Sequence, residues 1–178
     1  MVECGIFSPD DHIELIDGLL VVKEPRSADH YAAIRRVRRV LEQVFGAGWQ
    51  VDPGAPIALD DDSEPEPDVS VIRSAADDYA SGHPTDPVLV VEISRARLAF
   101  DRGRKNSLYA RAQVPEYWIV NLVDRVLELH REPRRSRPAR YGWRYTDVQI
   151  LGTDQSVSPL AAPRAHIAVA ALLPPDRG

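Results

Sequence analysis

The sequence has one cysteine and no long apolar run, which argues against an internal disulfide bond and a membrane-spanning helix. Its single cysteine, Cys4, has no partner for an internal disulfide bond. No apolar segment approaches the roughly 18 residues that a membrane-spanning helix needs. The segment Met1 to Asp11 lacks a basic stretch followed by an apolar one, so no signal peptide is expected. Together these features predict a cytoplasmic protein.

Lysine is almost absent, and the overall charge is acidic. The formal net charge is −5, which argues against a protein that coats DNA without specificity. A nuclease remains compatible with this charge, because acidic clusters that bind metal lower the total while basic patches act locally. The 22 basic residues include only two lysines, Lys23 and Lys105. In a chain so biased toward arginine, each lysine is a candidate for a specific role.

The order of predicted elements indicates an α/β fold. The 178 residues suit a single domain, 1–178, and 44% hydrophobic residues can fill its core. Asp17-Gly18 predicts a hairpin turn within residues 13–23, and Ser27 or Asp29 is suited to cap a helix that ends at Gly46. Further strands are predicted at 68–72, 88–93, 117–122, 126–130, 141–147 and 164–169, short extended pieces at 49–59, a helix at 98–113, and loops at 60–67, 74–87 and 131–140. Such an order favours a mixed sheet flanked by helices.

Three residues form a candidate catalytic group. Asp68 opens one predicted strand, and Glu92 lies near the end of the most hydrophobic run, VLVVEI. If these strands are neighbours, the two carboxylates meet at one edge of the sheet and suit a hard cation such as Mg²⁺. Lys105, on the following helix, would supply an ammonium that orients water and stabilises phosphate charge.

Each of these residues also has an ordinary structural interpretation. Asp68 follows a proline and is typical of a turn residue, and Lys105 comes one helical turn after Asp101, which suits a surface ion pair. Glu92 is harder to explain, since carboxylates are almost never buried unpaired; a core arginine would be its alternative partner. The three residues in this order favour a site over the separate explanations.

Other polar and aromatic residues are weaker candidates. Glu14 in the hairpin and His30 in the first turn of the first helix would face the same cleft if that helix crosses the sheet edge. Otherwise they are a solvent-facing carboxylate and a capping or surface histidine. The arginine groups 35–39 and 131–140 would grip a DNA backbone or form a solvated face. Among the aromatic residues, Tyr117 and Trp118 are predicted to pack in the core, and Trp143 and Tyr145 to be more exposed.

Five blocks of sequence resemble a known family. They are IELIDGLLVV, SADHYAAI, EPEPDVSVI, VLVVEIS and FDRGRKNSLYARAQVPEYWIVNL. In this order they are similar to the motifs of the Uma family of putative restriction endonucleases, which belongs to the PD-(D/E)XK nuclease superfamily. The resemblance covers residues 13–131 and continues more weakly to the end. It implies a restriction-endonuclease-like mixed β-sheet flanked by helices.

The resemblance also implies roles for individual residues. Asp68 and Glu92 would be the metal ligands, and Lys105 would be the catalytic lysine. The superfamily lysine usually lies two residues after the second acid, where this chain has Ser94, so Lys105 matches a position moved to the following helix. Glu14 and His30 would be auxiliary. Where relatives carry small and acidic residues, this chain has Arg95 and Arg97, which would either hold phosphate or signal altered chemistry.

The resulting expectation is a metal-dependent DNA endonuclease that hydrolyses phosphodiester bonds with a water activated by Mg²⁺ or Mn²⁺. Arg35, Arg39, Arg95 and Arg97 are its candidate DNA contacts, and the resemblance suggests a homodimer. One alternative is a catalytically silent nuclease-fold module that binds nucleic acid or a protein. Another is a hydrolase or toxin-like partner protein whose acidic site acts on a small phosphoester.

Overall fold

The computed structural model describes residues 13–23, 27–74 and 82–176. The expectations on Met1 to Asp11, on Cys4 and on part of the 74–87 connection lie outside these residues. No helix within the described ranges is long and apolar enough to cross a membrane.

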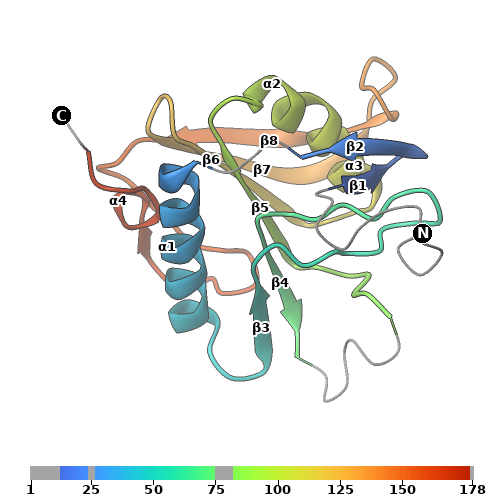
Figure 1. Ribbon diagram of the computed structural model, residues 1–178. Coiled ribbons are helices and arrows are strands. Elements are labelled where there is room, and N and C mark those ends of the chain that lie inside the picture. The colour runs from blue at the N-terminus through green and yellow to red at the C-terminus, as the bar shows by residue number, and fades with distance from the viewer. Residues whose placement is uncertain (1–12, 24–26, 75–81, 177–178) are drawn as a thin grey trace.

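A six-stranded mixed sheet forms the centre of the molecule, in the order β3-β4-β5-β6-β7-β8. β5 and β6 run parallel, and the other neighbours are antiparallel. Figure 1 shows these strands crossing the middle of the fold. The strands are β3 (Trp49–Asp52), β4 (Val69–Arg73), β5 (Leu89–Ser94), β6 (Glu116–Asn121), β7 (Val126–Arg135) and β8 (Trp143–Leu151). The predicted fold class, a mixed β-sheet flanked by helices, is confirmed.

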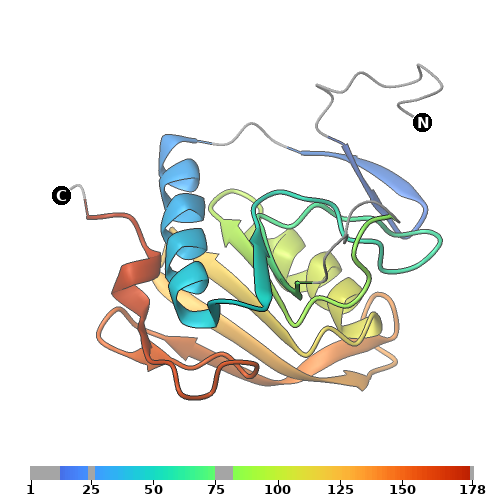
Figure 2. The same cartoon turned by 90° about the horizontal axis from the view of Figure 1, so that it is seen from below.

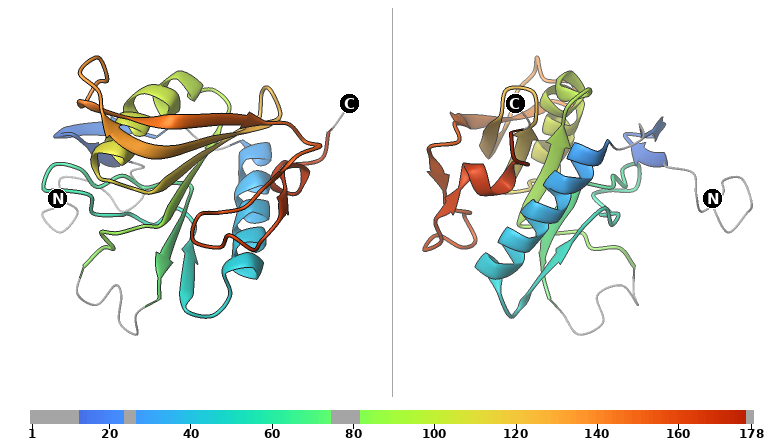
Figure 3. Two further views of the ribbon diagram at one scale, coloured as in Figure 1. Left: turned by 180° about the vertical axis from the view of Figure 1, so that it is seen from behind. Right: turned by 60° about the vertical axis from the view of Figure 1, so that its left-hand side comes forward.

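The first helix, α1 (Ala28–Phe45), begins at the predicted cap and covers one face of the sheet. The Ser27 hydroxyl accepts a hydrogen bond from the His30 backbone N–H at 3.3 Å, which satisfies one of the free donors of the first turn. Val37 and Leu41 are fully buried on the face toward the sheet. The short C-terminal helix α4 (Val169–Leu172) belongs to the same apolar cluster. Figure 3 shows both helices on this side of the strands.

A second helical segment covers the opposite face of the sheet. It consists of α2 (Leu98–Phe100), the π-helical turn η1 (Asp101–Lys105) and α3 (Asn106–Arg111). Tyr109 packs there against Tyr117 in a separate core cluster. The sequence predicted a single helix over 98–113. The structure instead contains a wide turn, in which the Asn106 N–H donates to the Asp101 carbonyl five residues back.

The hairpin of β1 (Ile13–Ile16) and β2 (Leu19–Val22) is a separate two-stranded sheet. Asp17 and Gly18 have φ of 51° and 74°, the left-handed values that a tight two-residue hairpin turn requires. The hairpin contacts the loop before β4 through a bridge between Leu15 and Glu64. Figure 2 shows it standing beside that loop, apart from the large sheet. The predicted hairpin is therefore confirmed.

Several local predictions were wrong. The predicted loop 131–140 begins as strand, because β7 continues to Arg135. Pairing with β6 ends at Arg131, so Pro133 lies where β7 has a partner on one side only, a place that tolerates proline. Tyr145, expected to be exposed, is 3% exposed. Two further predictions covered too much strand. Of residues 49–59 only β3 is strand, and of residues 164–169 only β10 (Ile167–Ala168), which pairs with β9 (Ser156–Val157).

Candidate active site

The two predicted carboxylates lie opposite each other on neighbouring strands. β4 and β5 pair with Val69 opposite Val91, so the same antiparallel register brings Asp68, one residue before β4, opposite Glu92. Side chains alternate along a strand. Val91 and Ile93 belong to the cluster under α1, whereas Val90 belongs to the cluster on the other face. Glu92 therefore points away from α1 and toward the η1–α3 segment.

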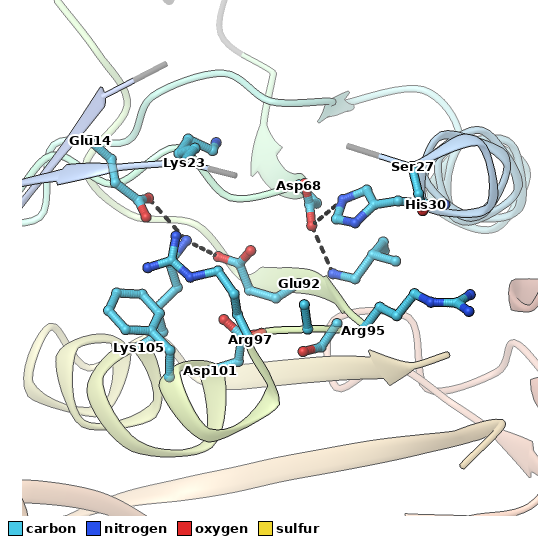
Figure 4. A pocket seen from close by; sticks show the side chains of 14 residues that line it. Glu14, Lys23, Ser27, His30, Asp68, Glu92, Arg95, Arg97, Asp101 and Lys105 are labelled. Atoms are coloured by element: carbon cyan, nitrogen blue, oxygen red, sulfur yellow. Dashed lines mark hydrogen bonds and ion pairs between the residues drawn. The ribbon is translucent and has the colours of Figure 1, made fainter. Parts of the chain in front are cut away.

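Lys105 reaches this carboxylate from the π-helical turn. Its ammonium lies 2.7 Å from Glu92 Oε1 and 3.0 Å from Glu14 Oε2. All three side chains are almost completely buried. Figure 4 shows Lys105 between the two glutamates, with dashed lines to both. The alternative of a surface ion pair with Asp101 is wrong, and so is the core arginine as the partner of Glu92.

The wide turn lies next to Lys105. In an α-helix, residues four apart lie on nearly the same side. Asp101, Lys105 and Tyr109 follow this spacing and are all buried. The i to i+5 hydrogen bond of η1 widens the turn between Asp101 and Asn106. Single π-helical turns are frequent at functional sites, and this one aligns the three side chains toward β5.

The two auxiliary candidates hold the principal ones in place. Glu14 binds Lys105, and its Oε2 also accepts from the Glu66 N–H at 3.3 Å. His30 Nε2 lies 3.0 Å from Asp68 Oδ2, and the same oxygen accepts from the Ile93 N–H at 2.9 Å. Asp68 is thus fixed from α1 and from β5. These contacts correct the views of Glu14 as a solvent-facing carboxylate and of His30 as a surface histidine.

Burial and crowding of negative charge shift the protonation of the site. Burial raises the pKa of Glu92 to about 7, and the Asp68 carboxylate adds to this rise while Lys105 opposes it. Burial likewise raises the pKa of Asp101. Burial alone would lower the pKa of Lys105, yet the carboxylates of Glu92, Glu14 and Asp101 raise it above its usual value. Lys105 therefore stays an ammonium, and Glu92 can exchange a proton near neutral pH.

These side chains line one pocket of about 150 Å³. Arg95 and Arg97 lie on its rim, Arg95 exposed and Arg97 half-buried. The exposed residues Arg35 and Arg39 of α1 are not part of its lining. The lining contains four carboxylates, Glu14, Asp68, Glu92 and Asp101. The lining also contains four cations, Lys23, Arg95, Arg97 and Lys105, but only Lys105 is deeply buried. Negative charge is therefore concentrated in the interior of the pocket, which we refer to as the acidic pocket.

Sequence reasoning missed two residues of the site. Asp101 was considered only as a surface partner of Lys105, but it is 6% exposed and lines the pocket. The Tyr109 hydroxyl donates to Glu92 Oε1 at 2.7 Å, and burial raises its own pKa well above the ordinary value. The four-residue spacing of Asp101, Lys105 and Tyr109 was the available signal, because residues at this spacing share one face of a helix.

Comparisons with known proteins identify the family and the fold of this chain. A family model described as a putative restriction endonuclease, Uma2, matches residues 3–170. The chain belongs to the Uma2 family. The family predicted from the sequence blocks is therefore confirmed. The fold of this chain is similar to that in the crystal structure of a putative nuclease belonging to DUF820 from Anabaena variabilis ATCC 29413. The TM-score is 0.72 at 16% sequence identity, and the match covers 96% of this chain and 94% of the other. No curated protein matches the chain.

Proposed function

We propose that this Uma2 protein is a metal-dependent endonuclease that hydrolyses phosphodiester bonds of DNA. The observation that carries the proposal is the buried ammonium of Lys105, held between Glu14 and Glu92, with Asp68 just before the adjacent strand. A protein that only needed a stable core would rarely bury a lysine with so many carboxylates, because desolvation of the charges opposes folding. Membership of a family described as putative restriction endonucleases supports the same assignment.

The donor set fits a divalent cation of the magnesium type. Among the residues that the structure describes, no three His, Cys, Asp or Glu side chains converge as a preformed cage. Mg²⁺ does not need one, since it is commonly bound by one or two carboxylates, waters and substrate phosphate oxygens. Asp68 and Glu92 would be those two carboxylates. Lys105 and Tyr109 both bind Glu92 Oε1, and the other oxygen turns toward Asp68 and the pocket (Figure 4). Bound there, the cation would lower the pKa of a water and polarise the phosphoryl group.

The protein's own side chains would then position the reaction. Lys105, kept protonated by its carboxylate neighbours, would act as a donor that holds the attacking water and stabilises charge on the phosphate. His30 and the Ile93 N–H fix the Asp68 carboxylate, and Glu14 fixes Lys105. Arg95 and Arg97 at the rim would bind the entering phosphodiester backbone.

The decisive experiment is plasmid cleavage with Mg²⁺ or Mn²⁺. We expect nicking by the wild type and a loss of about 100-fold or more in Glu92→Gln and Lys105→Met. The control is Lys23→Met, which removes the other lysine of the chain. Lys23 also lines the pocket, but its ammonium binds the Glu66 carbonyl at 2.7 Å and makes no contact with Glu92 within the described structure, so its loss should change cleavage only several-fold. Circular dichroism would verify that each variant is folded.

The results also separate the alternatives. No cleavage of any DNA by the wild type, with DNA binding retained in Glu92→Gln, would indicate a silent binding module. The four arginines of the rim and of α1 that were predicted to contact DNA would then serve binding alone. Cleavage of a small phosphodiester without cleavage of DNA would indicate a different hydrolase. Homodimer formation remains a prediction, and light scattering with and without DNA would test it.

A further inference from the structure

A second concave surface lies on the opposite side of the η1–α3 segment from the acidic pocket. It is formed by η1, the start of α3, the 138–140 loop and β8, and Phe100 belongs to both surfaces. Its lining includes four arginines, Arg102, Arg104, Arg140 and Arg144, and no aspartate or glutamate among the described residues. In a protein of net charge −5, this concentration of positive charge is unusual. We refer to it as the basic groove.

The floor of the basic groove contains a buried donor without a partner. His130 lines the groove and is 5% exposed. Its Nδ1 lies 3.1 Å from Asn106 Nδ2; because an amide NH₂ can only donate, Nδ1 accepts and the ring proton is on Nε2. Nε2 has no hydrogen-bond partner within the described structure. Burial lowers the pKa of His130 to about 4, so the ring is neutral, and its unpartnered N–H lies buried beneath the groove.

The walls of the groove are held in place. The Ser107 hydroxyl donates to the Trp143 carbonyl at 2.7 Å and accepts from the Tyr141 N–H at 2.9 Å, which joins α3 to the start of β8. Arg102 is bound to Glu128 by two hydrogen bonds of 2.8 and 2.7 Å. Arg140 and Arg144 are exposed, so their charges are available to a ligand.

The two surfaces are connected around Phe100. The guanidinium of Arg97, on the rim of the acidic pocket, lies 4.2 Å from the Phe100 ring centroid. Arg104, in the basic groove, lies 5.9 Å from the same centroid. A row of positive charge therefore leads from the candidate active site to the groove.

From these observations we infer that the basic groove binds backbone phosphates of the nucleic acid strand whose scissile bond lies in the acidic pocket. Arg104, Arg140 and Arg144 would neutralise the phosphates, and His130 Nε2 would donate to one phosphate oxygen. The ligand is an anion because all of these groups are donors. The inference rests on the proposed nuclease function, since it states where the substrate is held beyond the cleaved bond.

Binding measured without cleavage tests the inference separately from the nuclease proposal. The probe is a short fluorescein-labelled DNA duplex, titrated with the full chain in EDTA and followed by fluorescence anisotropy. We expect Arg140→Ala/Arg144→Ala to weaken binding by about tenfold at low salt. The slope of log Kd against log salt should also fall by about 1 for each phosphate that the variant no longer neutralises. Glu92→Gln should bind normally even though it does not cut.

The matched control removes the same charge elsewhere. Arg73 and Arg164 are exposed and line neither surface, so Arg73→Ala/Arg164→Ala should leave binding and its salt slope nearly unchanged. Equal weakening in both double variants would overturn the groove and leave only a nonspecific charge effect. Weakening in Arg35→Ala/Arg39→Ala but not in Arg140→Ala/Arg144→Ala would also overturn it and assign binding to α1.

A second readout avoids any change to the buried residues. In protein with ¹⁵N-labelled histidine, the duplex should shift the ring resonances of His130 and not those of the exposed His83. Inorganic phosphate alone distinguishes the two sources of a phosphate group. A shift with the duplex at far lower concentration than with inorganic phosphate supports a backbone site, whereas equal potency, or no shift with the duplex, contradicts it.

Discussion

The two sides of the η1–α3 segment face surfaces of different charge. Asp101, Lys105 and Tyr109 face the acidic pocket, while Arg104 and Asn106 face the basic groove. The acidic side is buried, and its groups satisfy one another. The basic side is open, and its donors exceed the acceptors that the described protein provides. The first surface is therefore suited to hold a cation and the second to hold an anion.

The largest effect is expected from substitutions of Lys105 and Glu92 in the acidic pocket. Removing one partner of a buried ion pair leaves an uncompensated charge and costs about 3 to 5 kcal/mol. We expect Lys105→Met to lose this amount of unfolding free energy and the double variant Glu92→Gln/Lys105→Met to recover part of it. Lys23→Met should cost less than about 1 kcal/mol, because its pair with Glu66 is partly exposed. Urea denaturation measures the free energy of unfolding of these variants and of Glu92→Gln alone. Additive effects of Lys105→Met and Glu92→Gln would contradict the pairing.

The second test uses the proton on Glu92. The pKa of Glu92 is raised from its ordinary value of 4.5 to about 7 in the folded protein. Between these two pH values the folded protein binds more protons than the unfolded chain. The free energy of unfolding that Glu92 contributes therefore falls as pH rises. Without metal, we expect the stability of the wild type relative to Glu92→Gln to fall by about 2 to 3 kcal/mol from pH 4.5 to pH 7 and then level off. A pH-independent difference in chemical denaturation would contradict the raised pKa.

The site residues differ in how well the sequence alone predicts them. Asp68 and Glu92 were predictable, because a strand start and a buried carboxylate are visible in the order of residues. Scarcity of lysine drew attention to Lys105. The π-helical turn was not predictable, since the residues 98–113 show the ordinary pattern of one continuous helix. The basic groove was not predictable either, because its arginines come from η1, from the 138–140 loop and from β8, which only the fold brings together.

A smaller effect is expected on the affinity for a divalent cation, because the cation competes with the proton on Glu92. A divalent cation requires the ionised Glu92 carboxylate, so its affinity should fall as pH drops below about 7. The expected change is about tenfold for each pH unit, or ~1.4 kcal/mol. Isothermal titration with Mn²⁺ at pH 6 and pH 8 measures it in the wild type, with Glu92→Gln as the variant that should bind weakly at both. Equal wild-type affinity at the two values would place the cation elsewhere.

The smallest effect distinguishes two buried tyrosines on the same side of the sheet. The Tyr109 hydroxyl donates to the Glu92 carboxylate at 2.7 Å, whereas the Tyr117 hydroxyl donates to the Asp101 carbonyl at 3.2 Å. Hydrogen bonds to charged groups are worth about 1.5 to 3 kcal/mol and neutral ones about 1 kcal/mol. Tyr109→Phe should therefore destabilise slightly more than Tyr117→Phe. It alone should also raise the pH at which Mn²⁺ affinity begins to fall, because the ionised Glu92 loses a donor. A purely structural Tyr109 would change stability in the two variants alike and leave that pH unmoved, so the pH profile, rather than stability, decides whether this helix positions the metal ligand.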